Sequence, residues 1–93
     1  MTVTAWKGGT YGIRVGLVNA HQYFKPQWST IDVRIEGRWR TFPLTKTFWT
    51  TCPEFRGGPI PAWLKKRRLV PWPLGRPPRF TLAPLGRNRF DLR

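Results

Sequence analysis

Few residues in the sequence could carry acid–base or nucleophilic chemistry, and they are widely spaced. His21 is the only histidine and Cys52 the only cysteine, so no internal disulfide or cysteine-based zinc site can form. General acid–base catalysis usually needs a histidine or a carboxyl group of shifted pKa, and a Mg²⁺-dependent nuclease needs clustered acids. The acidic residues are Asp32, Glu36, Glu54 and Asp91. We therefore predict no catalytic residue, no metal site, no cofactor and no enzyme activity, with a small nuclease as the catalytic alternative.

Basic side chains are the strongest chemical signal in the chain. Seventeen Lys and Arg residues face four Asp and Glu residues, which gives a formal net charge of +13 and a pI of about 11.7. Such an excess is the usual electrostatic signature of nucleic-acid binding, because phosphates neutralise the repulsion among the cations. Most of these residues are Arg, whose planar guanidinium fits phosphates and guanine edges. The composition therefore favours DNA or RNA as the partner.

The cations need a scaffold, and the first part of the chain predicts a β-hairpin. Residues 3–6 and 11–17 alternate apolar and polar side chains on either side of a Gly-Gly pair. The alternation predicts that Leu17 points inward and that Arg14 points outward.

A short helix and a second hairpin are expected next. Asn19 is placed to cap a helix over residues 20–24, and a proline follows that helix. Residues 30–36 and 38–44 form the clearest strand pair, joined by a Glu-Gly turn. The apolar residues of the second strand depart from strict alternation, so we expect a bulge near Thr41.

The second half of the chain is less regular. Residues 45–50 predict another strand or an ordered loop, and Thr51 and Glu54 have the spacing of a capping box for a short helix. Apolar residues at helical spacing predict a helix over residues 61–69. The remaining expected elements are an extended Pro-rich loop at 70–78 and strands at 79–83 and 89–92.

The aromatic residues indicate how this scaffold is filled. The pattern places most of them in the core: Trp6, Tyr11, Phe24, Trp39, Phe42, Phe48, Trp63, Phe80 and Phe90. Six or seven short strands with one or two short helices usually close into a small open β-barrel. We therefore predict a mainly β fold and one domain over residues 1–93.

Candidate binding residues follow from the expected hairpins and loops. Three tryptophans fall in loops and could stack on unpaired bases: Trp28, Trp49 and Trp72. If the hairpins are neighbours in the sheet, their outer basic residues form one face able to contact phosphates. The predicted site contains Lys7, Arg14, Arg34, Arg38, Arg40, Lys46, Trp49 and Arg56.

The order of these elements resembles a known family. The similarity rests on the strand motifs at 13–17 and 31–35, the helical pair Tyr23-Phe24, and the later residues Gly37, Trp39, Trp63-Leu64, Leu69, Gly75, Phe80-Thr81-Leu82 and Phe90. This arrangement resembles the B3-like DNA-binding pseudobarrel of plant transcription factors, which is also the effector-binding domain of some restriction endonucleases. The resemblance implies a seven-stranded open barrel with two helices.

The resemblance also implies a way of binding DNA. Members of the family grip the major groove between two arms, one at the first hairpin and one at the central strands and the loop after them. On this sequence the first arm would carry Lys7, Thr10 and Arg14. The second arm would carry Arg38, Arg40, Lys46, Thr47 and Arg56.

We therefore expect a non-catalytic domain that binds double-stranded DNA through two Arg- and Lys-bearing arms. One alternative is a binder of single-stranded DNA or RNA, of OB or cold-shock type. Another is a structural or interaction protein that binds an acidic protein. The lack of a signal-peptide pattern and of long apolar runs favours a cytoplasmic location without membrane contact, at the nucleoid or in the nucleus if DNA is the partner. The sequence does not indicate the oligomeric state.

Overall fold

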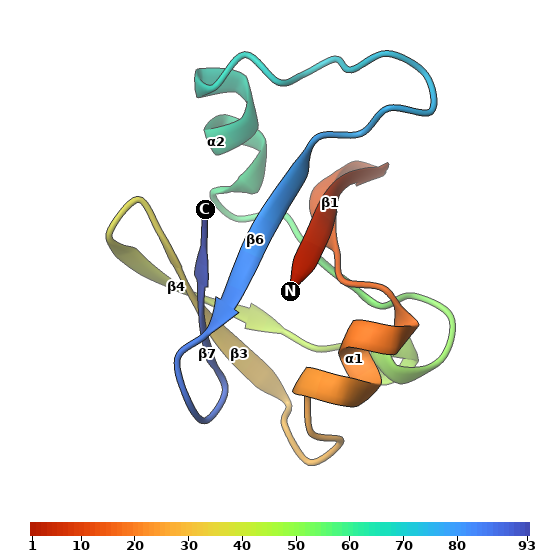
Figure 1. Cartoon of the computed structure of the whole chain (residues 1–93), viewed down its shortest axis with the longest axis vertical. Coiled ribbons are helices and arrows are strands. Elements are labelled where there is room, and N and C mark those ends of the chain that lie inside the picture. The colour runs from red at the N-terminus through yellow and green to blue at the C-terminus, as the bar shows by residue number, and fades with distance from the viewer.

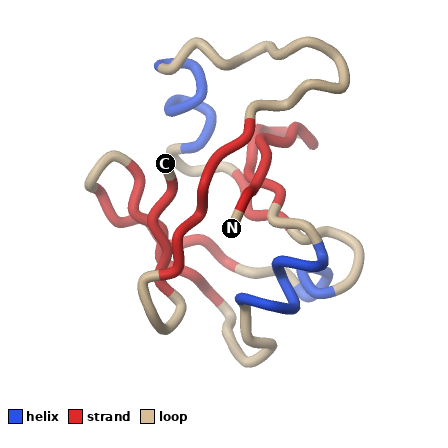
Figure 2. The backbone as a smooth tube through the Cα atoms, in the orientation of Figure 1, coloured by secondary structure: helices blue, strands red, loops and turns tan.

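The computed structural model describes residues 1–93 and contains seven strands, two α-helices and one 3₁₀ helix. The strands are β1 (Thr2–Gly8), β2 (Thr10–Arg14), β3 (Thr30–Ile35), β4 (Arg38–Pro43), β5 (Glu54–Arg56), β6 (Arg79–Pro84) and β7 (Arg89–Leu92). The helices are α1 (Leu17–Tyr23), η1 (Lys46–Trp49) and α2 (Ile60–Lys66). The prediction of a mainly β protein is therefore confirmed (Figure 1, Figure 2).

All seven strands belong to one strongly curved sheet, in the order β4-β3-β7-β6-β1-β2-β5. Neighbours are antiparallel except β3 and β7, which run parallel. The edge strands β4 and β5 approach each other without forming a ladder, and the rings of Phe42 and Phe55 meet across this seam at 4.9 Å between centroids. The sheet thus forms a small open β-barrel, as the sequence predicted, and the gap in the barrel lies between β4 and β5.

The last strand lies in the middle of this order. β7 inserts between β3 and β6, pairing Phe90 with Val33 and Leu92 with both Ile35 and Leu82. The Asn88 side chain, just before β7, donates a hydrogen bond to the Thr30 carbonyl at 3.0 Å. β7 therefore joins the β3–β4 hairpin to the other four strands.

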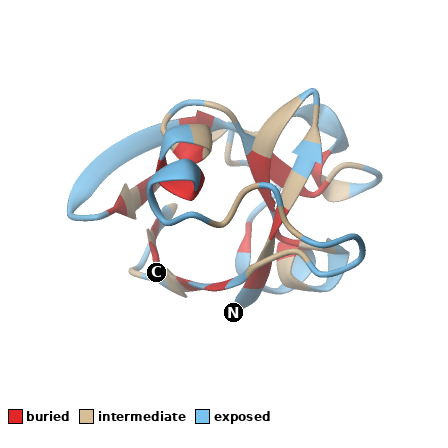
Figure 3. Ribbon diagram, turned by 90° about the horizontal axis from the view of Figure 1, so that it is seen from above, coloured by how far each residue is buried: buried red, intermediate tan, exposed pale blue.

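The inner face of the sheet and the two helices form one apolar core. It contains 19 buried residues, to which every strand, α1, η1 and α2 contribute. In Figure 3 the buried segments follow the strands and α2 around the interior of the barrel. In the view of Figure 1, α2 lies at the upper end of the barrel and α1 at the lower end.

The β3–β4 hairpin has the predicted tight turn but not the predicted bulge. Glu36 and Gly37 both have positive φ, at 51° and 78°, as a two-residue hairpin turn requires. The ladder is regular along its whole length, with Trp39 opposite Arg34. Phe42 points inward and is 2% exposed, so Trp39, three residues earlier, points outward. The expectation that Trp39 belongs to the core was therefore wrong. The same expectation was wrong for Trp6, which is half-buried on the outer side of β1 because Val3 and Ala5 face the core.

The first helix starts earlier than predicted. α1 begins at Leu17, directly after Gly16, so β2 is shorter than expected and the Leu17 side chain is exposed. Asn19 lies inside the first turn instead of capping the helix. Its Nδ2 donates to the carbonyls of Val15 and Thr2, both at 3.0 Å, which ties the helix to the start of β1.

The region between β4 and α2 also differs from the prediction. The capping-box pattern of Thr51 and Glu54 does not form a helix; Glu54 instead begins β5, which pairs with β2. Residues 46–49 form the 3₁₀ helix η1, which packs near α1. The helix expected at 61–69 is present as α2 and buries Trp63.

Residues 70–78 form the expected loop without helix or strand, above the barrel in Figure 1. The loop is attached near the first hairpin, because the Trp72 ring meets that of Tyr11 edge-on at 5.6 Å and the Pro78 carbonyl accepts the Ala5 N–H. None of the helices is long and apolar enough to cross a bilayer.

Candidate nucleic-acid interface

The predicted basic residues do not all share one face of the barrel. We call the outer side of β1, β2 and β5 the Trp6 face. It carries Trp6, Thr10, Arg14 and Arg56, with Thr10 beside the β1–β2 turn. Lys7 lies at the same turn but on the opposite side of β1, where its Nζ is 5.5 Å from the centroid of the Tyr11 ring. The Trp6 face therefore unites Thr10 and Arg14 of the expected first arm with Arg56 of the second.

Two guanidinium groups flank the Trp6 ring on this face. The Cζ atoms of Arg14 and Arg56 lie 5.5 and 5.6 Å from the ring centroid, within range of a cation–π contact. Arg56 Nη1 also donates a 2.9 Å hydrogen bond to the Gly8 carbonyl. These contacts fix both cations over the sheet, so less side-chain entropy is lost when they bind a ligand.

Two glycines make this packing possible. The Trp6 ring covers Gly8 so closely that a β-carbon there would overlap the ring. Gly12 lies between Trp6 and Arg56 in the sheet, and its missing side chain lets the two groups meet across β2. Glycine is thus required at both positions by close approach to a side chain.

We expect Gly12→Ala to destabilise the protein by about 1–3 kcal/mol, because the new methyl group would lie 2.6 Å from Arg56 Cβ and from the Phe55 carbonyl oxygen. Urea unfolding followed by circular dichroism measures the change. Thr81→Ala, at an exposed position of β6, is the control and should alter stability by no more than about 0.5 kcal/mol. Equal stability of the two variants would contradict the close packing at Gly12.

The loop after β4 borders the other end of the Trp6 face. The Pro53 carbonyl accepts the Val15 N–H at 2.8 Å, and the Thr47 carbonyl accepts the N–H of Cys52 at 2.9 Å. Thr47 and its neighbour Lys46 are exposed on η1, close in the chain to the start of β5. The face thus extends from the β1–β2 turn to this loop.

Glu54 is the one acid on the Trp6 face, and it is buried. Its side chain is 3% exposed, and its Oε2 atom lies 4.0 Å from Arg14 Nε without a hydrogen-bond partner. The Glu54 carboxylate therefore lies beneath the guanidinium group of Arg14 and is shielded from solvent.

The loop tryptophans are less available for stacking than predicted. Trp49 meets the rings of Phe48 and Phe24 at 4.8 and 6.5 Å, and Trp28 meets Phe24 and Phe90 edge-on. Both are half-buried, as is Trp72. The predicted binding residue Trp49 is thus mainly part of the aromatic packing around α1.

A second aromatic–basic group, the Trp39 face, lies on the outer side of β3, β4 and β7. Trp39 is 45% exposed, and Arg34 and Arg89 lie with Cζ atoms 5.4 and 5.9 Å from its ring centroid. Arg34 Nε is 2.9 Å from Asp91 Oδ1, which partly neutralises this predicted binding residue. The parallel pairing of β3 with β7 brings in Arg89, which sequence reasoning missed because that pairing has no local signal.

Asp91 should make stability depend on pH in acid. The hydrogen bond from Arg34 holds the pKa of Asp91 below its ordinary value of 3.8, with a second bond from Arg93 in the same direction and burial opposing both. Because the folded pKa is the lower one, the stabilisation is complete above the unfolded pKa and is lost as pH falls through the folded pKa. We expect Asp91→Asn to unfold more easily at neutral pH and to lose less further stability below about pH 4. Urea midpoints across this pH range measure both effects, and parallel curves for wild type and variant would refute the assignment.

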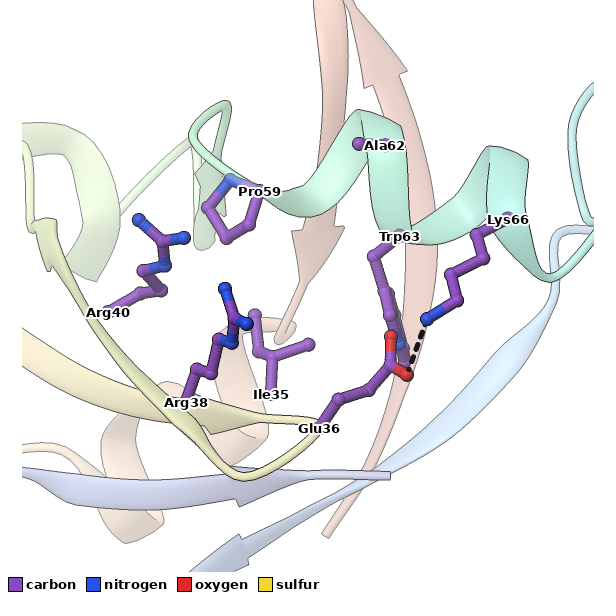
Figure 4. A pocket seen from close by; sticks show the side chains of 8 residues that line it. All are labelled: Ile35, Glu36, Arg38, Arg40, Pro59, Ala62, Trp63 and Lys66. Carbon is purple, nitrogen blue, oxygen red and sulfur yellow. Dashed lines mark hydrogen bonds and ion pairs between the residues drawn. The ribbon is translucent and has the colours of Figure 1, made fainter.

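Arg38 and Arg40 lie on neither outer face. They stand opposite Ile35 and Val33 in the ladder, so they project from the inner side of β4, beyond the core and toward α2. Figure 4 shows both guanidinium groups in the groove between β4 and α2. The prediction that the hairpin arginines form one outer basic face was therefore wrong, because alternation separates Arg34 from the other two.

Few of the cations are neutralised within the fold. The ion pairs join Arg14 to Glu54, Lys66 to Glu36, and Arg34 and Arg93 to Asp91. Asp32 accepts a 2.6 Å hydrogen bond from the Thr41 hydroxyl and has no basic partner within 4.0 Å. Four of the 17 basic side chains are thus paired, which leaves 13 without an acidic partner.

No group of three or more His, Cys, Asp or Glu side chains is arranged to hold a metal ion.

Comparison of the chain with protein-family models, with curated proteins and with solved structures finds no match.

Proposed function

We propose that the protein binds nucleic acid, and double-stranded DNA in the first place, through the Trp6 face. The observation that carries the proposal is the set of 13 basic side chains without an acidic partner on a barrel whose acids are few. A polyanion is the ligand that relieves such self-repulsion, and the release of its counterions adds to the binding free energy.

The Trp6 face is the best candidate for the duplex contact because its cations are held in place. Arg14 and Arg56 are fixed on the Trp6 ring, and the only acid nearby is buried. Lys7 and Lys46 lie at its two ends, one beside the β1–β2 turn and one on η1. The first arm implied by the B3-like resemblance corresponds to this turn. Of the second arm, Arg56 and the loop after β4 lie at this surface, whereas Arg38 and Arg40 do not.

Each group would have a distinct role on the duplex. The lysines would contact phosphate oxygens and supply affinity without sequence preference. A guanidinium group that reaches a base edge would favour guanine, since it can donate to O6 and N7 together. The threonine hydroxyls of Thr10 and Thr47 are exposed or half-exposed donors suited to phosphate or base contacts.

The Trp39 face favours a second candidate function, the binding of single-stranded DNA or RNA. Trp39 is the most exposed aromatic ring of the protein and has no aromatic neighbour, while two guanidinium groups lie beside it. An exposed ring among cations can stack on an unpaired base, worth about 1–3 kcal/mol per base.

A titration with labelled duplex and single-stranded oligonucleotides separates the two functions. For duplex binding, we expect fluorescence anisotropy to give the tighter affinity with duplex, and Trp39→Ala to leave it unchanged. Tighter binding to single strands, lost in Trp39→Ala, would replace the first function by the second. A partner retained by the immobilised protein after complete nuclease digestion, with neither oligonucleotide bound, would instead indicate an acidic protein as the ligand.

A further inference from the structure

A hollow lies between the β3–β4 hairpin and α2. It has a volume of about 440 Å³ and eight lining residues, four of them charged. Glu36, Arg38 and Arg40 come from the hairpin side, and Lys66 comes from α2 (Figure 4). This groove shares no residue with the Trp6 face or with the Trp39 face.

The hairpin wall supplies two unpaired guanidinium groups. Arg38 and Arg40 are two positions apart on β4, so their side chains leave the same side of the strand about 6.6–6.8 Å apart at Cα. Neither forms an ion pair or a side-chain hydrogen bond, and both are exposed. In Figure 4 both point from β4 toward α2. Two neighbouring guanidinium groups whose N–H donors are all free can bind one anion together.

The opposite wall of the groove is formed by α2, which contributes Trp63 and Lys66. Lys66 Nζ is 3.3 Å from Glu36 Oε2, a contact that links α2 to the β3–β4 turn at one side of the hollow. Trp63 is 4% exposed and forms part of the floor. Because Lys66 neutralises Glu36, the uncompensated charge of the groove belongs to Arg38 and Arg40.

We propose that this groove binds a phosphate group between Arg38 and Arg40. A phosphate offers more acceptor oxygens and more negative charge than a carboxylate, so it can accept bidentate hydrogen bonds from both guanidinium groups. The phosphate could belong to a nucleic-acid backbone or to a small phosphorylated molecule. In the first case the proposal extends the proposed function by adding a second contact region to the Trp6 face.

The test uses the double variant Arg38→Gln/Arg40→Gln and inorganic pyrophosphate as the probe. In ¹H–¹⁵N NMR spectra of the whole protein, we expect pyrophosphate to shift the signals of Arg38, Arg40 and residues of α2, and the double variant to lose these shifts. Lys65→Gln/Arg68→Gln removes the same charge from exposed positions that do not line the groove and is the matched control. Citrate, a polycarboxylate, tests selectivity.

Loss of binding in the groove variant alone supports the proposal. Shifts that persist in that variant, shifts lost equally in the control, or equal affinity for citrate would overturn it. A duplex titration identifies the source: a fall of the salt slope by about 0.9 in the groove variant, as expected for the loss of one phosphate contact, assigns the site to nucleic-acid phosphates. An unchanged slope with lost pyrophosphate binding assigns it to a small phosphorylated molecule. Loss of duplex binding on substitution of the Trp6 face leaves the pyrophosphate result untouched, so the two proposals fail separately.

Discussion

The double variant Lys7→Gln/Arg56→Gln should bind duplex DNA about fiftyfold more weakly than wild type at 0.1 M salt. Each basic residue that neutralises a phosphate contributes about 0.9 to the slope of log K against log salt, so two lost contacts lower the slope by about 1.8. Arg56 belongs to the Trp6 face, and Lys7 lies at the β1–β2 turn that ends this face. Neither has an acidic partner, so their removal leaves no buried charge unpaired. Fluorescence anisotropy at several salt concentrations measures affinity and slope together.

The control for this result is Lys65→Gln/Arg87→Gln, which makes the same change of net charge on α2 and on the β6–β7 turn. If the interface is the Trp6 face, the control should keep the wild-type slope and lose only a few-fold in affinity through the general field. Equal losses in the two double variants would show that binding depends on net charge alone, and the Trp6 face would cease to be the interface.

Phe24→Ala should have the largest effect on stability, a loss of about 3–5 kcal/mol. Phe24 is 4% exposed and is the centre of the aromatic cluster beneath α1. Its ring stacks on Phe90 at 4.7 Å between centroids with planes 15° apart, and meets Phe48 at 4.9 Å. Truncation would leave a cavity between α1, η1 and β7, and small domains have only about 5–15 kcal/mol of stability in total.

Urea unfolding followed by tryptophan fluorescence tests this expectation. Tyr23→Ala is a matched control, since Tyr23 is the last residue of α1, directly before Phe24, and its ring is 37% exposed. The control should lose about 1 kcal/mol or less. A Phe24→Ala variant as stable as the Tyr23→Ala variant would mean that the cluster around Phe24 does not hold α1 to the barrel.

The β3–β4 hairpin shows which parts of the fold could be predicted from the sequence. Strict alternation in β3 and a Glu-Gly pair with both φ values positive specify two strands and their turn locally. β6 and β7 were predicted for the same reason. These elements need no knowledge of distant residues, because the period of two and the turn residues determine them.

Other elements depend on contacts that no local pattern encodes. The spacing of Thr51 and Glu54 suits a helix cap, yet the chain forms β5 there because β2 offers an unpaired edge and Phe55 enters the core. Trp39 was assigned to the core from the strand pattern, with a bulge near Thr41 to bring it to the same side as Phe42. It is outside because Arg34 and Arg89 cover it and Phe42 already occupies the inner side.

The candidate site was predictable residue by residue but not as an arrangement. Lys7, Arg14 and Arg56 could be named from charge and the expected hairpin. The fold brings Arg14 and Arg56 to one face through the β2–β5 pairing and leaves Lys7 at the β1–β2 turn, over the ring of Tyr11. Arg38 and Arg40 were named as well, but their position opposite α2 depends on how far β4 extends beyond the core. Lys66 was missed as a groove residue because helix α2 gives no sign of which strand it faces.

The insertion of β7 between β3 and β6 has a consequence for synthesis on the ribosome. β7 is the last of the seven strands to be translated, and it is the only one that joins the β3–β4 hairpin to the remaining four strands. Until it emerges, β3 and β6 each have an edge whose backbone donors and acceptors lack partners, and such edges promote aggregation. A nascent chain that ends before residue 89 should therefore require a chaperone and should not fold into a smaller barrel.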